Sequence, residues 1–204
     1  MSNDPLNDLR EIRKLMEGST KFISVSGLSA IFAGAIALTG AGIAWWKLGL
    51  SMETPLGYAY ASDPDSIQFM LVDAFLVLIL ATLSGLVFTI RKAKQQSQSI
   101  WTQSSRQLLL DFCLPLAVGG VFSIFLFTQG FIGLIAPSML IFYGLSLINA
   151  SHKTLSDVRY LGYIQVFLGC LNLIFIGHGF VFWCLGFGVM HMVYGSIMYF
   201  KYER

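Results

Sequence analysis

The stretch from Gly162 to Tyr199 reads GYIQVFLGCLNLIFIG, then HGF, then VFWCLGFGVMHMVYGSIMY. Each of its two long apolar segments approaches the ~20 residues that a helix needs to cross a hydrocarbon layer of ~30 Å. The junction at Gly177, His178 and Gly179 is too short for anything but a tight reversal of the chain. The stretch therefore predicts two antiparallel neighbouring helices that cross a membrane.

A similar pattern occurs about fifty residues upstream. The matched positions, at offsets of 49, 49 and 51 residues, are Gly120 with Gly169, Gly130 with Gly179, and Tyr143-Gly144 with Tyr194-Gly195. The predicted fold is an all-α membrane protein of six transmembrane helices, built as three helical hairpins. The expected spans lie near 22–46, 67–90, 107–128, 131–150, 157–177 and 180–200, within a bundle over 21–200.

Composition supports a membrane protein. The 204 residues are 55% hydrophobic and 12% charged, with a mean hydropathy of +0.69, whereas soluble domains carry about 25% charged residues. The net charge of +2 is too small to indicate a nucleic-acid partner. Cys113, Cys170 and Cys184 all lie in apolar segments without a CxxC pair, so neither a disulfide framework nor a zinc site is expected.

The first twenty residues predict a short amphipathic helix that precedes the bundle. Asp4-Pro5 is a favourable helix start, and apolar residues then recur every three or four positions from Leu6 to Met16. This cytosolic helix would lie on the membrane surface or pack on the cytosolic ends of the spans, and the pattern does not separate the two. The chain ends in an expected cytosolic tail, 201–204.

The first span is rich in small residues at four-residue spacing. The two series are Ser26, Ala30, Gly34 and Ala33, Ala37, Ala41. Such spacing allows two helix backbones to approach closely in lipid. We expect this face to contact another span of the same chain; the alternatives are a second protomer, giving a homo-oligomer, and another membrane protein.

The basic residues predict the orientation. Twelve fall on one side of the expected spans: Arg10, Arg13, Lys14, Lys21, Arg91, Lys92, Lys94, Arg106, Lys153, Arg159, Lys201 and Arg204. The other side has Lys47 alone. Because cytoplasmic loops collect Lys and Arg, the pattern predicts a multi-pass membrane protein with both termini in the cytoplasm.

Few ionisable residues fall inside the spans, where each is a candidate functional residue because its burial in lipid is costly. Asp73 lies about five residues into the second span from the outer side, and Asp111 lies at a similar depth in the third span from the inner side. Neither is at the midplane, where a coupling ion would bind. A structural role is expected for both, with Asp111 paired to Arg159 and Asp73 paired to His178.

A second set of candidates is polar and deeper. His191 lies about eleven residues into the sixth span, and Gln165 and Asn172 share one face of the fifth. The three could line a small cavity, or they could join helices through hydrogen bonds of ~0.6 kcal/mol each. The second interpretation is favoured. We expect no catalytic, metal or cofactor site: a haem between spans needs two facing histidines, and no HExxH, GxSxG or Walker motif occurs.

The two ends of the chain carry a resemblance. The stretches LREIRKLMEGSTKFISVSGLSAIFAG and WCLGFGVMHMVYGSIMYFKYE resemble a bacterial family of six-span membrane proteins without an assigned activity. The hairpin repeat is loosely similar to short-loop six-span proteins of acid resistance. Neither resemblance implies catalytic residues.

Two classes of function follow from these observations. The first is a non-enzymatic membrane protein that senses, scaffolds or binds a partner. The second is a small transporter or channel for a solute or protons, using the polar residues of spans five and six. The near absence of charge at the midplane favours the first.

Overall fold

The computed structural model describes residues 26–49, 63–96 and 99–204. Every regular element within these ranges is a helix. The elements are α2 Gly27–Leu48, α3 Pro64–Gln95, α4 Gln103–Thr128, the 3₁₀ turn η1 Ile132–Leu134, α5 Ile135–Ala150, α6 Val158–Ile174, α7 Gly179–Trp183, the π-helix η2 Cys184–Met190 and α8 His191–Tyr202. The helix predicted over residues 1–20, and the start of the first span, lie outside the described residues.

Five of the helical segments are long and apolar enough to cross a membrane. They are α2, α3, α4, η1 with α5, and the continuous run Gly179–Tyr202 formed by α7, η2 and α8. The sixth apolar helix, α6, has 17 residues. The described part of the chain is therefore all-helical, with several helices suited to a membrane.

Helix ends follow local capping chemistry. Asp63 precedes Pro64, the first residue of α3, and its carboxylate accepts hydrogen bonds from the Ser66 amide (3.0 Å) and hydroxyl (2.6 Å). These bonds hold the pKa of Asp63 below its ordinary value. At α4, Thr102 and Ser105 form a capping box, which places the helix start four residues before the expected 107.

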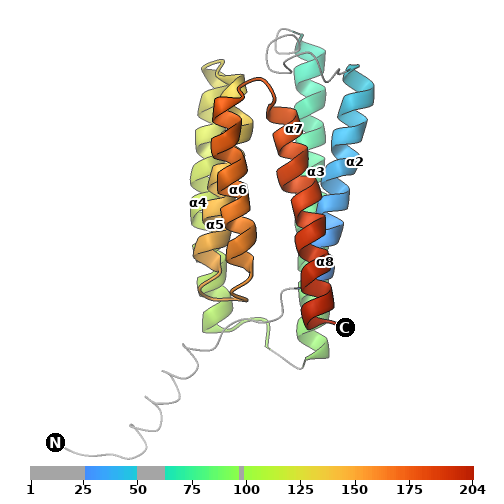
Figure 1. Cartoon of the computed structure of the whole chain (residues 1–204), viewed down its shortest axis with the longest axis vertical. Helices are drawn as coiled ribbons and strands as arrows, with labels where there is room; N and C mark the ends of the chain where they lie inside the picture. The colour runs from blue at the N-terminus through green and yellow to red at the C-terminus, as the bar shows by residue number, and fades with distance from the viewer. Residues whose placement is uncertain (1–25, 50–62, 97–98) are drawn as a thin grey trace, which may run out of the picture.

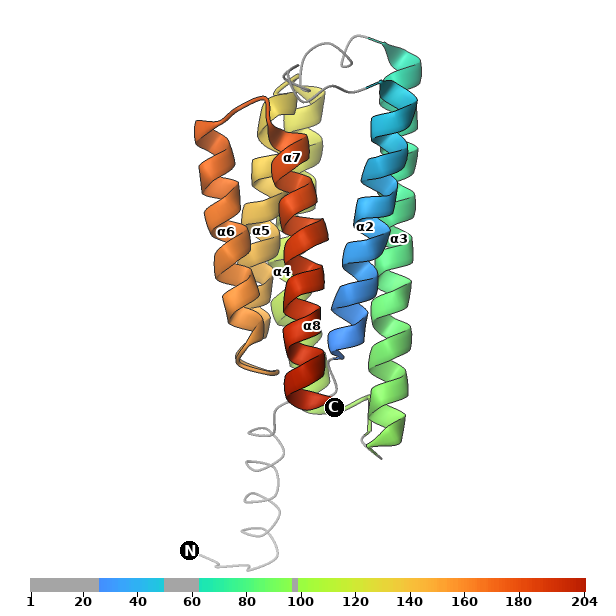
Figure 2. The same cartoon turned by 45° about the vertical axis from the view of Figure 1, so that its right-hand side comes forward.

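The helices form two groups, each with a central helix that packs on two others (Figures 1 and 2). In one, hereafter the α4 group, α5 packs on both α4 and α6. In the other, the α2 group, α2 packs on α3 and on the α7–η2–α8 run. Contacts between the groups are fewer and involve α5 and α6 with α7 and η2. The two apolar segments of the Gly162–Tyr199 stretch thus pack mainly in different groups, and α6 contacts the run that follows it chiefly at α7 and η2.

Close backbone contacts explain this division. A Cβ atom on Gly144 of α5 would lie 2.7 Å from the carbonyl oxygen of Gly162 in α6. Likewise, a Cβ atom on Gly195 of α8 would lie 2.6 Å from the carbonyl oxygen of Gly27 in α2. Only glycine permits such approach. The glycines of α6 and α8 therefore place the closest backbone contacts of these helices against α5 and α2.

The small-residue face of α2 is used within the chain. Gly34, Ala37 and Ala41 are buried, and a Cβ atom on Gly34 would lie 2.7 Å from the Gly188 carbonyl oxygen in η2. This is the contact expected from the four-residue spacing. Part of the face, including Ala30 and Ala33, is only half-buried.

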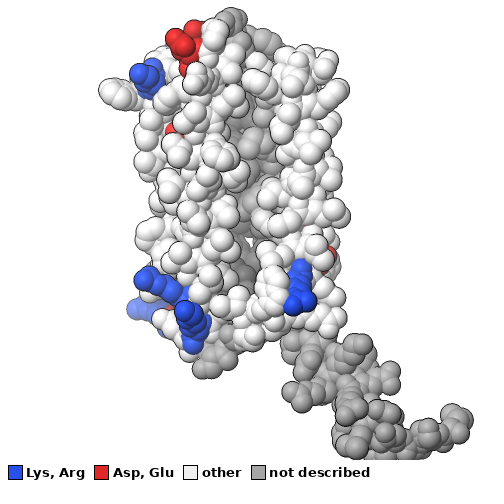
Figure 3. Space-filling model, turned by 180° about the vertical axis from the view of Figure 1, so that it is seen from behind, with Lys and Arg blue, Asp and Glu red and all other residues white. Residues whose placement is uncertain are grey.

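The charged side chains separate along the helix axes. In Figure 3 most visible Lys and Arg side chains lie at the end of the molecule where α3 ends and α4 begins, and most visible acidic ones lie at the opposite end. The first end carries Lys92, Lys94 and Arg106, and the second carries Asp63 and Asp65. We name the basic end the inner end.

Candidate functional site: a polar cluster at a π-helix

The sixth predicted span is interrupted by the π-helix η2, Cys184–Met190. A π-helical turn holds one more residue than an α-helical turn, and such segments occur often at functional sites. Gly186 and Gly188 lie in this segment and both are buried. A Cβ atom on Gly186 would lie 2.5 Å from Oε1 of Gln165. The absence of a side chain at Gly186 thus lets α6 place a polar group against the backbone of η2.

His191 begins α8 directly after η2 and is 5% exposed. Its Nδ1 lies 2.9 Å from the carbonyl oxygen of Gly186, and its Nε2 lies 2.7 Å from the hydroxyl of Tyr143 in α5. A carbonyl only accepts hydrogen bonds, so Nδ1 carries the proton and donates it. In the neutral ring Nε2 then accepts a hydrogen bond from the Tyr143 hydroxyl.

Gln165 of α6 completes the cluster. Its amide nitrogen donates to the same Gly186 oxygen at 2.8 Å, and it lies 3.4 Å from Nδ1 of His191. The carbonyl has two lone pairs and receives one bond from each side chain. We call Tyr143, Gln165, Gly186 and His191 the polar cluster. It brings together three of the helices, α5, α6 and the η2–α8 run.

The structure thus brings together two of the three deep candidates, and it adds Tyr143, which was not among them. The repeat of Tyr143-Gly144 as Tyr194-Gly195 was the available signal. Phe187 of η2 stacks beside His191, with ring centroids 6.0 Å apart, and the Tyr143 ring is tilted against both of them. The aromatic rings reduce access of solvent to the cluster.

Asn172, the third deep candidate, lies apart from the cluster. Its amide nitrogen donates to the Phe175 carbonyl at 3.3 Å near the outer end of α6. Like Gln165 it is 0% exposed. Three buried oxygens in this region have no hydrogen-bond partner within the described residues: Gln165 Oε1, Asn172 Oδ1 and the Tyr194 hydroxyl.

The predicted pair of Asp111 and Arg159 is not formed. The Asp111 backbone carbonyl accepts a bond from the Asn149 amide at 2.8 Å, whereas Arg159 Nε donates to the Ser156 carbonyl at 3.2 Å. The Arg159 side chain is exposed beside Asp157, whose pKa it helps to lower. Because α4 starts at Gln103, Asp111 is the ninth residue of its helix, whereas Arg159 is the second residue of α6, so the two side chains do not lie at matching depths.

The predicted pair of Asp73 and His178 is also not formed. Asp73 lies against α2, with its carboxylate oxygens 3.4 and 3.5 Å from the position of a Cβ on Gly40. His178 is exposed in the turn before α7, in the segment that joins the two groups, and its backbone amide donates to the Phe175 carbonyl. The small Gly40 leaves room for the Asp73 carboxylate beside α2, so Asp73 stays within its own hairpin.

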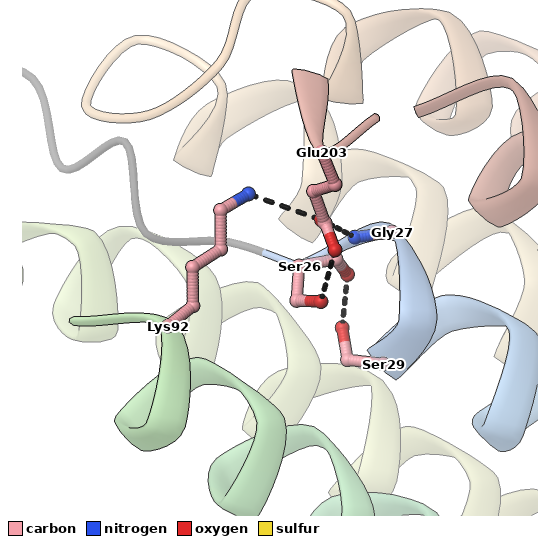
Figure 4. A network of polar contacts seen from close by, with 5 residues as sticks. All are labelled: Ser26, Gly27, Ser29, Lys92 and Glu203. Atoms are coloured by element: carbon pink, nitrogen blue, oxygen red, sulfur yellow. Dashed lines mark hydrogen bonds and ion pairs between the residues drawn. The ribbon is translucent and has the colours of Figure 1, made fainter. Parts of the chain in front are cut away.

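Two ion pairs of the described residues lie at the inner end. In the first, Glu203 accepts hydrogen bonds from the Gly27 amide (2.5 Å), the Ser26 hydroxyl (3.1 Å) and Lys92 Nζ (3.0 Å), as Figure 4 shows. Its carboxylate thus meets the positive N-terminus of α2. Glu203, in the expected tail 201–204, therefore links the end of α8 to α2 and α3 through hydrogen bonds and an ion pair.

The second ion pair joins α8 to the α4 group. Asp157, directly before α6, accepts bonds from Lys201 Nζ at 2.6 Å and from the Tyr202 hydroxyl at 3.1 Å. The hydrogen bond from Lys201 is the main reason that the pKa of Asp157 lies below its ordinary value. Together the two ion pairs fix the C-terminal residues to both groups.

The cluster offers hydrogen bonds but little else for chemistry. Among the described residues no group of three His, Cys, Asp or Glu side chains could hold a metal ion. Comparisons with family models, curated proteins and solved structures yield no match to this chain. Its function has to be argued from its own residues.

Proposed function

We propose that the chain is a six-span protein of the bacterial inner membrane, with α6 as the sixth span and both termini in the cytoplasm. At 1.5 Å per residue the 17 residues of α6 extend over about 25 Å, near the lower limit for a span. The basic residues at the inner end support the orientation, since such residues collect in the cytoplasm.

We propose further that the protein is not an enzyme and acts by sensing, scaffolding or binding another membrane component. One observation carries this proposal: the imidazole of His191, midway along the helices, is buried and fully bonded to neighbouring helices. The ring of His191 uses both nitrogens, one on Gly186 and one on Tyr143. No ring nitrogen remains to bind a substrate or to exchange a proton with solvent. Such bonds are typical of interhelical contacts in lipid.

The lipid bilayer is the environment that the exposed surface fits. Only three residues of α3 are buried, Val77, Lys92 and Ala93, and α4 buries only four of its 26 residues. In water such surfaces would be unfavourable by ~25 cal/mol per Å². Within the bilayer they leave two long helix faces accessible to a homo-oligomer or another membrane protein, in addition to the half-buried part of the α2 face.

A second candidate function is passage of protons or a small solute between α6 and α8. The observation in its favour is the set of buried oxygens without partners, on Gln165, Asn172 and Tyr194. Such atoms are often bonded to water. A file of water from Tyr194 to Asn172 would connect the cluster with both ends of α6.

A flux measurement separates the two candidates. The parent protein and a His191→Leu variant are reconstituted into vesicles that contain a pH-sensitive dye, and a proton gradient is applied. The proposal expects no flux in either protein. Proton flux in the parent that is lost in the variant would favour passage and would contradict the proposed function. A Val193→Leu variant, on the exposed face of the same helix, is the matched control.

The orientation is tested separately with reporters. A fluorescent protein that folds only in the cytoplasm, fused after Arg204, is expected to be active, and a periplasmic phosphatase at the same point is expected to be inactive. The reverse result would contradict an even number of spans from a cytoplasmic start.

A further inference from the structure

Two of the helix contacts repeat one another. In each, the glycine of a helix that runs to the inner end meets a glycine of a helix that starts there. Gly144 of α5 meets Gly162 of α6, and Gly195 of α8 meets Gly27 of α2, with each carbonyl oxygen 2.6–2.8 Å from the position of a Cβ on its partner. The second helix of one predicted hairpin thus packs on the first helix of another.

Two helices, α3 and α4, take no part in these two contacts, and both contain small residues at comparable positions. Gly85 of α3 precedes Lys92 by seven residues, much as Gly144 precedes Lys153 by nine and Gly195 precedes Lys201 by six. On α4, Cys113 and Gly120 precede Gly162 and Gly169 of α6 by 49 residues each. A third contact of the same kind would therefore join α3 to α4.

That third contact is open in the structure. No atom lies within 4 Å of a Cβ placed on Gly85 or on Gly120, and Cys113 is exposed. Figure 3 shows a furrow between the group that contains α3 and the group that contains α4. Beyond its own hairpin partner α2, helix α3 has no extensive contact among the described elements.

The connecting chain is long enough for the contact to form. Seven residues, 96–102, join Gln95 of α3 to Gln103 of α4, and seven residues, 151–157, join Ala150 of α5 to Val158 of α6. The second connector allows α5 and α6 to pack along their lengths. The first therefore imposes no greater separation on α3 and α4.

We propose that the observed arrangement is the open state of a closable bundle, in which α3 packs on α4 with Gly85 against Cys113. Closure moves the α2 group relative to the α4 group. The two groups are joined at the inner end by the bond of Lys201 to Asp157, and midway along the helices by the bonds of Tyr143 and Gln165 to the η2–α8 run. The axis of this motion therefore runs along these contacts. All three hairpins then make equivalent contacts.

Cysteine cross-linking in the full-length protein tests the closure. Gly85→Cys is introduced beside the native Cys113, with Cys170 and Cys184 replaced by Ala, and a protease site is inserted in the connector 96–102. Membranes are oxidised with copper phenanthroline and then cleaved. Because a disulfide needs Cβ atoms ~3.8 Å apart, the two fragments stay linked only if α3 reaches α4.

The matched control is Val87→Cys, two residues along the same helix and ~200° around it, where the native side chain is 48% exposed. The proposal expects linked fragments of a single chain for Gly85→Cys, at least fivefold more than for Val87→Cys. Three outcomes would overturn it: no linked product, equal yields from the two variants, or a product that links two copies of the chain. The last would mean that a second copy occupies the furrow.

Discussion

The middle and the inner end of the bundle join helices to one another by different chemistry. Midway along the helices the bonds are neutral: an imidazole and an amide donate to one backbone carbonyl, and a tyrosine hydroxyl donates to the other nitrogen of the imidazole. At the inner end the bonds are ionic, between Asp157 and Lys201 and between Glu203 and Lys92. Both sets involve the helix that ends the chain, so position along the helix, rather than the identity of the helices, decides the chemistry.

The difference follows from the surroundings of each set. A charge at the centre of a bilayer is costly, and an unpaired polar group there loses its hydrogen bonds to water. Neutral donors and acceptors that satisfy one another avoid both penalties. Near the headgroups, water and ions reduce the cost of charge, so carboxylates and amines can form pairs. Each prediction below changes one of these two sets.

The largest effect is expected for Gly186→Val. The new side chain would overlap Leu140 and Gln165 Oε1, which displaces Gln165 and removes its bond to the carbonyl. Overpacking and the lost bond should together lower the free energy of unfolding by about 3 kcal/mol. Denaturation in detergent measures the change. Gly42→Val, at a site with no atom within 4 Å, should change stability by less than about 0.5 kcal/mol; equal losses would mean that Gly186 is not closely packed.

A smaller effect is expected for Glu203→Gln at the inner end. The amide keeps one acceptor for the Gly27 amide but loses the charge that Lys92 and the α2 N-terminus favour. The loss should be about 1 kcal/mol and should shrink as salt is added, since ionic strength screens the parent pair. Arg204→Gln, one residue further along, should have little effect. A loss of equal size at every salt concentration would contradict an ionic contribution.

The smallest effect is expected at Asp157, and it appears as a dependence on pH. Its pKa is lowered in the folded protein, chiefly by Lys201. The stabilisation is therefore complete above the unfolded pKa of ~3.9 and is lost as the pH falls through the folded pKa. Because the pair is exposed, it should amount to less than about 1 kcal/mol. In Asp157→Asn, the unfolding free energy measured between pH 6 and pH 2 should fall less steeply with pH than in the parent. An unchanged pH dependence would refute the assignment.

The sequence predicted the class of fold because apolar length is a direct requirement of the bilayer. The helix cores lie where the apolar segments predicted them, and α3 starts at Pro64, three residues before the expected start of the second span at 67. The packing was harder to predict. The short turn at His178 indicated that α6 and α8 are neighbours, but the contacts of Gly162 with α5 and Gly195 with α2 determine where those helices pack.

The site was predicted in part for the same reason. Gln165 and His191 stood out because polar residues are rare in apolar segments. Tyr143 did not, since tyrosine is also common at interfaces. The π-helix could not be inferred from residues 184–190, because the extra residue is recognisable only from the hydrogen bonds of the turn. Glu203 was missed because a charged residue at the chain end is usually solvated.

The central claim is that Tyr143 and His191 join the two groups by a neutral hydrogen bond, and a double-mutant cycle tests it most directly. Tyr143→Phe, His191→Leu and the double variant are unfolded in detergent beside the parent. The account predicts that the losses of unfolding free energy in the two single variants add up to about 1 kcal/mol more than the loss in the double variant. The reason is that each single change removes the same bond. Strictly additive losses would contradict the bond and leave the two side chains as independent packing residues.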